Sequence, residues 1–373
     1  MLTKDKELIR ECRFVLEQIF RKNIETYIDL FFYEKEVILE PNQAEILGKA
    51  GILTRDNESN YAKVMIFPFK NKFIVTDFLL SIRKMLNGRY IRGVDDVWVM
   101  FPHETLLFID RLKESGETAL DLASGSGAIS LFLADQFNEV FSLDINPKAI
   151  QYAKFNAMLN GSENKIVNLH SDMFTNIKDR KFDFICWNGP TVAMPEIKNA
   201  KQVYPLYTYG GHDGAEFTKR FLSEVLEYTE QKFKIKWWDG SLGTEKESVV
   251  IRFIKDHLCN EKIKVTVDYL NKRGATYLSE YDKMYEKYCL DKFDLNQSNE
   301  NRKIAVKSWY NQLKKEKLNK VYISIITIEP SEEFELIEKY PTKTYVSARR
   351  VLGFEWHYAS RKFIKSYLLE QNP

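Results

Sequence analysis

The sequence predicts an α/β fold: a mostly parallel sheet with helices on both faces, preceded by a small α+β module. From about residue 95, short apolar runs alternate with helix-like segments, which is typical of parallel sheets. A glycine-rich turn joins the first of these runs to a helix. The next three runs each lead into an acidic or amide residue, so polar side chains are expected to gather at one sheet edge.

The first 95 residues predict a separate module of helices and a β-ribbon. Residues 4–22 place apolar side chains at helical spacing, and residues 42–53 indicate another helix. Two strands are expected at 62–69 and 72–78. This order suggests a winged-helix-like module for substrate recognition or dimerisation, rather than for reading DNA.

The remaining residues, 96–373, predict the sheet domain. Its first five strands are expected at 118–122, 139–143, 165–169, 182–187 and 233–238. Its helices are expected at 127–136, 147–160, 214–230 and 245–258. Two further apolar segments, 262–269 and 321–329, indicate strands, and the second is rich in β-branched residues.

Residues 271–318, between those two strands, predict a helical insertion. A connection of this length is uncommon unless it has structure of its own, so we expect a cap near the substrate side. The stretch 301–320, which overlaps the end of this insertion, is basic, with Glu316 as its single acid. A solvated helix flank is the ordinary reading of such a stretch, and a phosphate-binding face is the alternative.

The turn Ser124-Gly125-Ser126-Gly127 follows the first sheet strand. Glycine lets the backbone approach a ligand closely, and the next helix presents free N–H groups. The turn alone also fits a nicotinamide-binding domain, whose third glycine would fall at Ser130. The motifs around later strands are therefore needed to distinguish a nicotinamide-binding domain from other α/β folds that begin with such a turn.

Four further motifs occur in order along the chain. They are Phe101-Pro102-His103-Glu104-Thr105, Asp144-Ile145-Asn146-Pro147, Asn188-Gly189-Pro190-Thr191 and Gly210-Gly211-His212-Asp213-Gly214. The series resembles class I S-adenosylmethionine-dependent methyltransferases of the small-domain subgroup, which carries an Asn-Pro-Pro-Tyr-type motif. Within it, the pattern is similar to release-factor glutamine N5-methyltransferases and RNA guanine N2-methyltransferases, over roughly residues 98 to 270.

This resemblance implies a Rossmann-like, seven-stranded methyltransferase sheet. Its last two strands would form an antiparallel hairpin from 262–269 and 321–329, with the helical insertion between them. The resemblance also implies S-adenosyl-L-methionine as the cofactor.

By the same resemblance, the glycine turn holds the methionine part of that cofactor. Ser124, Gly125 and Gly127 would lie against it, and Asp121 would face its amino group. Ala123 stands where the family has its first glycine. We expect its methyl group to fit if φ stays negative.

The adenosine part is expected to lie at the next two strand ends. Asp144, with Ile145 beside it, offers two acceptor oxygens to the two ribose hydroxyls. Asp172 and Met173 resemble the family's adenine clamp, an acceptor for the exocyclic amine beside an apolar wall.

For catalysis, the resemblance assigns the side-chain carbonyl of Asn188 and the following backbone carbonyl, at Gly189, as acceptors from a substrate NH2 group. Asn188 also counts among the cofactor contacts, and Pro190 keeps the motif's second proline. Hydrogen bonds of this kind point a nitrogen lone pair at the methyl group. Thr191 replaces the aromatic residue that would stack on a planar substrate.

A ring could reach the substrate from elsewhere, with Trp187, Tyr204, Tyr207 and Tyr209 as candidates. His212 and Asp213 are candidate general bases or substrate contacts, although their loop is chiefly architectural in the family.

Composition excludes several classes of protein. No apolar run reaches the length of a membrane span, and the first residues lack a signal peptide's apolar stretch. Four scattered cysteines predict reduced thiols in the cytoplasm, and the absence of a Cys/His cluster predicts no metal site. The net charge of +2 gives little drive toward nucleic acid, and the sequence does not indicate an oligomeric state.

The sequence thus predicts an N-directed methyltransferase acting on a small amino or guanidino metabolite or on a peptide side chain. Two alternatives stay open: methylation of RNA or another nucleic acid, and a catalytically degenerate cofactor-binding scaffold subunit.

Overall fold

The computed structural model covers all 373 residues. It describes residues 1–56, 59–78, 85–86, 89–90, 93–97, 104–195, 204–281, 299–345 and 361–372.

The N-terminal module is α+β, as predicted. Its helices are α1 (Lys6–Lys22), α2 (Ile24–Phe31) and α3 (Pro41–Lys49). Two hairpins follow, β1 (Leu53–Asp56) with β2 (Ser59–Ala62), and β3 (Met65–Phe69) with β4 (Lys72–Thr76). Asp5 starts α1 by accepting hydrogen bonds from the backbone N–H groups of Glu7 and Leu8. A short pair, β5 (Met85–Leu86) and β6 (Arg89–Tyr90), comes next.

The sheet domain begins at α4 (Thr105–Ile109). Its strands are β7 (Gly116–Leu122), β8 (Phe137–Asp144), β9 (Ile166–His170), β10 (Phe182–Trp187), β11 (Thr229–Asp239), β13 (Ile263–Tyr269), β16 (Ser324–Pro330) and β17 (Glu335–Lys339). Its helices are α5 (Ala128–Leu133), α6 (Pro147–Leu159), α7 (Glu216–Glu224), the 3-10 turn η2 (Val225–Tyr228) and α8 (Val249–His257).

These strands form one sheet in the order β17-β13-β16-β11-β10-β7-β8-β9. The five from β9 to β11 are parallel, and β16 runs antiparallel between β11 and β13. The predicted α/β sheet and its antiparallel terminal hairpin are confirmed. The expected count of seven strands was wrong by one, because β17 adds to the edge beside β13.

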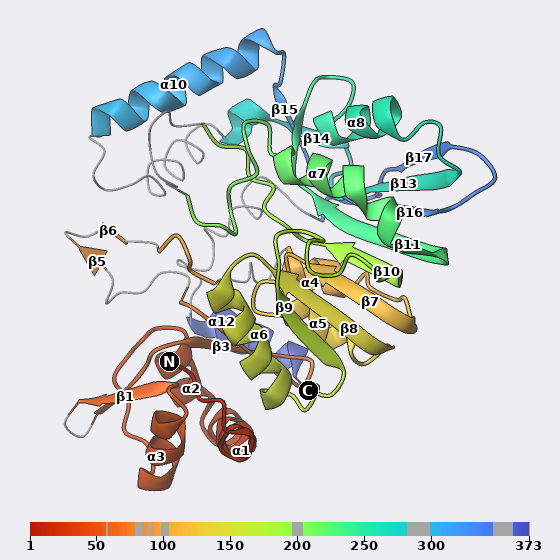
Figure 1. The fold of residues 1–373 in the computed structure, drawn as a ribbon. Helices are drawn as coiled ribbons and strands as arrows, with labels where there is room; N and C mark the ends of the chain where they lie inside the picture. The colour runs from red at the N-terminus through yellow and green to blue at the C-terminus, as the bar shows by residue number, and fades with distance from the viewer. Residues whose placement is uncertain are drawn as a thin grey trace.

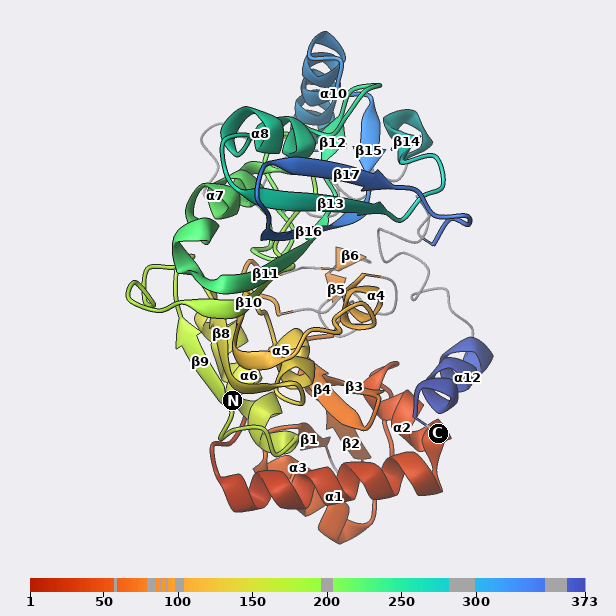
Figure 2. The ribbon, with the colours of Figure 1, turned by 90° about the vertical axis from the view of Figure 1, so that its right-hand side faces the viewer.

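The sheet buries an apolar cluster on each face. Along β10, Phe184 and Cys186 join one cluster while Ile185 and Trp187 join the other, as the two-residue period of a strand requires. Helices α5 and α6 cover the first face and α7 and α8 the second (Figures 1 and 2).

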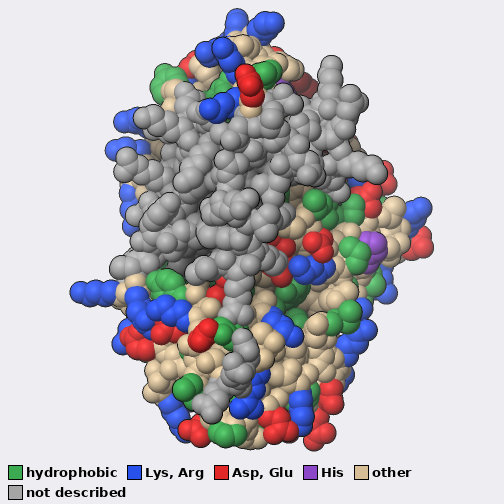
Figure 3. Space-filling view, turned by 90° about the vertical axis from the view of Figure 1, so that its left-hand side faces the viewer, with side chains coloured by type: hydrophobic (Ala, Val, Ile, Leu, Met, Phe, Trp, Pro, Cys, Tyr) green, Lys and Arg blue, Asp and Glu red, His purple; other side chains and the backbone are tan. Residues whose placement is uncertain are grey.

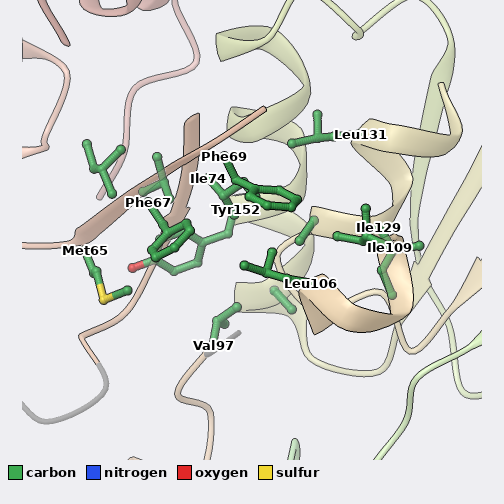
Figure 4. Close-up of a cluster of buried hydrophobic side chains, with 14 of the residues drawn as sticks. Met65, Phe67, Phe69, Ile74, Val97, Leu106, Ile109, Ile129, Leu131 and Tyr152 are labelled. Atoms are coloured by element: carbon green, nitrogen blue, oxygen red, sulfur yellow. The ribbon is translucent and has the colours of Figure 1, made fainter. Parts of the chain in front are cut away.

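The N-terminal module packs on the first face through the β3–β4 hairpin. Figure 4 shows Phe67, Phe69 and Ile74 of this hairpin next to Tyr152 of α6, in one buried cluster that also contains Ile129 of α5. All five side chains are buried. The module and the sheet domain therefore share one apolar core.

The insertion between β13 and β16 is only partly helical. It contributes β14 (Ala275–Tyr277), η3 (Leu278–Tyr281) and α10 (Asn299–Lys315). The expected helical insertion thus contains helix α10 and also a strand, because β14 joins β15 (Lys320–Tyr322) and β12 (Leu242–Gly243) in a separate small sheet. Residues 282–298 of the insertion lie outside the described residues.

The last helix, α12 (Arg361–Gln371), returns to the N-terminal module. Arg361 and Lys365 pair with Glu25 of α2, and Asn372 donates to the carbonyl of Pro68. The predicted boundary at residue 95 stays a prediction, but the structure places this C-terminal helix against the first part. None of the helices in the described ranges combines the length and the apolar character that crossing a bilayer requires.

Candidate functional site

A cavity of about 210 Å³ opens at the carboxyl ends of the parallel strands. Residues directly after β7, β8, β9 and β10 line it, as expected for an open α/β sheet. Segments 96–97, 104–105 and 206–208 complete its wall. The structure therefore brings together the strand-end residues that the sequence singled out.

The glycine turn after β7 is held on both sides. The N–H of Ser124 donates to the carbonyl of Leu143 at 2.9 Å, and that of Gly125 donates to Asp144 Oδ2 at 2.8 Å. Gly125 has φ +56°, and a Cβ built on it would meet no atom within 4 Å. The space beside Gly125 is thus open for a ligand to approach the backbone.

Two other cavity residues have left-handed backbone without being glycine. Ala123 has φ +56° and Met173 has φ +47°. The condition of a negative φ at Ala123 is not met, because Ala123 takes the left-handed turn conformation in spite of its methyl group. Such backbone costs roughly 1–2 kcal/mol per residue and is often found at ligand sites.

Asp144, at the end of β8, lines the cavity. Its two oxygens accept from the N–H groups of Gly125 and Asn146, both at 2.8 Å. Burial raises the pKa of this carboxyl, and the two backbone N–H groups oppose that rise. Each oxygen keeps a further lone pair, as contact with two vicinal hydroxyls requires.

The predicted adenine clamp also borders the cavity. Asp172 is exposed, and its Oδ1 accepts from Arg220 at 2.7 Å, which leaves Oδ2 for another donor. Met173 is buried, and Ile145 is 49% exposed although it is apolar. An exposed apolar side chain beside a cavity offers a flat ring a contact surface.

Asp121 and Gly127 were expected to touch the cofactor, but neither borders the cavity. Asp121 is fully buried and accepts hydrogen bonds from Ser130 Oγ at 2.6 Å and from Cys186 Sγ at 3.6 Å. Burial raises its pKa to about 7. A Cβ on Gly127 would lie 3.1 Å from that of Ala153, so Gly127 allows α5 and α6 to approach each other.

The Asn188-Gly189-Pro190-Thr191 turn leaves β10 along the cavity. Asn188 Oδ1 is buried and has no hydrogen-bond partner among the described residues. A Cβ on Gly189 would lie 2.1 Å from Cζ2 of Trp187. The glycine at this position is therefore explained by the indole ring that lies against it.

Thr191 is buried in the same turn, where three glycines come close to it. A Cβ on Gly210, Gly214 or Gly240 would lie 2.6–2.8 Å from the nearest Thr191 atom. The Gly-Gly-His-Asp-Gly loop thus supports the turn, as its expected architectural role implies.

The residues proposed to contact the substrate separate into two groups. Thr191 and Tyr207 line the cavity, while His212 and Asp213 do not. His212 Nε2 lies 2.8 Å from Glu316 Oε2, and Asp213 accepts from Lys219 and from the N–H of Ala215. Both side chains hold the loop and its neighbours in place.

Sequence reasoning missed Glu104 and Asp96, which both line the cavity. Burial raises the pKa of Glu104 to about 8. Glu104 lies in the quoted Phe101–Thr105 motif, so a signal existed for it, whereas Asp96 belongs to no motif. Residues 101–103 of that motif lie outside the described residues.

The residues present fit S-adenosylmethionine. The hydroxyls of Ser124 and Ser126 line the cavity, are buried, and lack partners among the described residues, so they can serve a carboxylate. Charged side chains that border the cavity in the described ranges are all acidic, which suits a positively charged donor. Across those ranges, no cluster of three His, Cys, Asp or Glu side chains could hold a metal.

Comparisons with known proteins agree with this geometry. A family model described as the methyltransferase small domain matches residues 101–202. A putative protein N5-glutamine methyltransferase of Methanocaldococcus jannaschii is 30% identical over 148 residues, which cover 39% of this chain and 74% of that protein.

Two release factor glutamine methyltransferases are also similar. That of Thermodesulfovibrio yellowstonii is 32% identical over 35% of this chain and 52% of its own length. That of Fusobacterium nucleatum is 39% identical over 39% of this chain and 45% of its own length. The chain thus spans about half the length of these two relatives.

Proposed function

This chain belongs to the methyltransferase small-domain family and uses S-adenosylmethionine, and from that premise we propose that it methylates the side-chain amide nitrogen of a glutamine in a peptide or protein. The similar proteins named above are glutamine methyltransferases, which favours this acceptor over a small metabolite. We also propose that the protein acts in the cytoplasm.

The observation that carries the proposal is the unpartnered carbonyl of Asn188. A buried carbonyl oxygen without a donor is unfavourable, and a substrate NH2 group would satisfy it. A hydrogen bond of this kind orients the acceptor nitrogen toward the bound methyl group, because it fixes where the two N–H bonds point.

The other cavity residues have assigned tasks in this proposal. When bound, the cofactor supplies a sulfonium-activated methyl group. Asp144 binds the ribose hydroxyls, and Ser124 and Ser126 bind the methionine carboxylate. Ile145 and Met173 enclose the adenine while Asp172 accepts from its amino group. Tyr207 from the adjoining loop borders the acceptor.

The test uses labelled S-adenosylmethionine with separated protein, RNA and small-molecule fractions of a cell extract. We expect label in the protein fraction, and N5-methylglutamine after enzymatic digestion. Label confined to RNA or to small molecules would contradict the proposal. Cofactor binding without turnover on any fraction would favour the scaffold alternative.

Two variants test the roles of the residues. Asn188→Ala should lower turnover at least about a hundredfold and leave cofactor affinity nearly unchanged. Asp144→Ala should instead weaken cofactor binding, as measured by calorimetry. Asn138→Ala, an exposed amide bonded to Glu117, is the control and should change neither quantity.

RNA remains a second candidate acceptor because of the basic helix α10. Lys303, Lys307 and Lys314 are exposed and fall on one helical face, and Figure 3 shows basic side chains gathered at the end of the molecule where α10 lies. RNA binding with an affinity that falls steeply with salt would support this candidate.

A further inference from the structure

Trp187 is the last residue of β10 and lines the cavity. Its side chain is 2% exposed, and its Nε1 has no hydrogen-bond partner among the described residues. Buried polar groups in native structures are nearly always bonded, so an unpartnered N–H beside a cavity points to a ligand that completes it.

The indole is fixed against the Asn188–Pro190 turn. A Cβ built on Gly189 would lie 2.1 Å from Cζ2 and 2.5 Å from Cε2, and Cε2 is the carbon bonded to Nε1. On its other side, the ring stacks on Phe221 with 5.3 Å between centroids and 12° between planes. The N–H therefore lies close to the turn that carries Asn188.

The next residue in the chain, Asn188, has the complementary unpartnered group. Its Oδ1 is a buried acceptor without a donor, whereas Trp187 Nε1 is a buried donor without an acceptor. A primary carboxamide offers both an N–H donor and a carbonyl acceptor on one carbon. An amine or a guanidinium group offers donors alone and would leave the indole N–H unsatisfied.

Building on the proposed function, we propose that Trp187 is an acceptor-binding residue: its indole N–H donates to the carbonyl oxygen of the same carboxamide whose NH2 group donates to Asn188. Its ring, held between Gly189 and Phe221, fixes the position of that N–H.

The matched variants are Trp187→Phe and Trp237→Phe. Trp237 is fully buried, its Nε1 is also unpartnered among the described residues, and its ring contacts the same Phe221, but it does not line the cavity. Both variants remove one buried N–H group and keep an aromatic ring. They differ because Trp187 lines the cavity in which the acceptor would bind and Trp237 does not.

The first measurement follows methylation of a pool of short glutamine-containing peptides, with lysine-containing and arginine-containing pools in parallel. Trp187→Phe should lower kcat/KM on the glutamine pool about ten- to a hundredfold, with cofactor affinity unchanged. Trp237→Phe should act as wild type. Equal rates for wild type and Trp187→Phe, or preferred labelling of the lysine or arginine pool, would overturn the proposal.

The second measurement needs no turnover. The indole ¹⁵N–¹H signals of the six tryptophans are recorded with S-adenosylhomocysteine present, and Trp187→Phe identifies the relevant signal. N-acetylglutamine N-methylamide should move that signal downfield and leave Trp237 in place. The N-methylamides of N-acetylnorvaline and N-acetyllysine lack a primary carboxamide and should not move it.

An unmoved Trp187 signal at saturating N-acetylglutamine N-methylamide overturns the proposal. A moved signal without peptide methylation would keep the carboxamide contact and reject the peptide acceptor, so the two ideas fail separately.

Discussion

Ala123 and Gly125 have the same φ of +56° on either side of Ser124, yet only one of them is a glycine. Sequence indicated a turn here but not its dihedral angles, which the hydrogen bonds of Ser124 and Gly125 to Leu143 and Asp144 determine. We therefore expect that the strain at Ala123 can be relieved by substitution without a change of fold.

Exchanging the two residue types tests this directly. Ala123→Gly should raise the free energy of unfolding by about 0.5–1 kcal/mol, because the Cβ strain is removed. Gly125→Ala should lower it by about 1 kcal/mol and also weaken cofactor binding, because the new Cβ enters the open space. Denaturant unfolding and calorimetry measure these effects, and changes of the same sign would contradict the interpretation.

Asp239 provides a pH test away from the cavity. It is fully buried and bonded to Ser241, and burial raises its pKa to about 7 from an ordinary value of 3.8. Between these two pH values the folded protein keeps the proton on Asp239, whereas the unfolded chain has lost it. The contribution of protonated Asp239 to stability is therefore complete below about pH 4 and is lost as pH rises through 7.

The free energy of unfolding of Asp239→Asn, taken relative to that of wild type, should therefore rise by on the order of 2 kcal/mol between pH 5 and pH 8. The exposed Asp256→Asn serves as the control for removing one charge. Thermal unfolding across that range measures both variants. A difference that does not change with pH would show that Asp239 is ionised throughout.

At the level of elements, strands with strong apolar patterns were predicted well, whereas the polar strand at the sheet edge was not. The central strands and the terminal hairpin appear within a few residues of their expected bounds, because their buried residues are nearly continuous. Strand β17 was missed because its sequence, Glu335–Lys339, is mostly exposed and polar, as suits an edge strand.

One other element, and one residue of the site, departed from expectation. The helix expected at 214–230 ends at Glu224, and a 3-10 turn then leads into β11, whose first residue is Thr229. In the site, strand-end positions were predictable, whereas the buried, internal hydrogen bonding of Asp121 was not. Its partners Ser130 and Cys186 come together only in the folded sheet.

Helix α12 offers a test of its docking on the N-terminal module. Leu368 is fully buried, whereas the next residue, Leu369, is 49% exposed. Leu368→Ala should cost about 2–3 kcal/mol of stability, because it leaves a cavity. Leu369→Ala should change stability by less than about 0.5 kcal/mol. Urea unfolding measures both, and equal effects would mean that α12 does not pack as described.

Across the whole molecule, one side chain links three parts. Asn156 of α6 is fully buried, and its Oδ1 accepts from the N–H of Val75 in β4. Its Nδ2 donates to the carbonyls of Val75 and Ser126, and Ser126 belongs to the glycine turn. This connection of Asn156 to the N-terminal module became evident only in the structure.

Asn156→Ala should destabilise the protein by about 2–4 kcal/mol, because it leaves three buried backbone groups without partners. It should also weaken cofactor binding through the loosened turn. The exposed Asn138→Ala is again the control. Loss of stability with cofactor affinity unchanged would mean that the turn does not depend on this contact.

The shared amide of Asn156 also couples occupancy of the cavity to distant backbone motion. A ligand that restrains Ser126 stabilises the arrangement in which Asn156 holds Val75, so opening of the β3–β4 hairpin becomes rarer. Deuterium uptake at the Val75 amide should therefore slow when S-adenosylhomocysteine is added, although that amide lies outside the lining of the cavity.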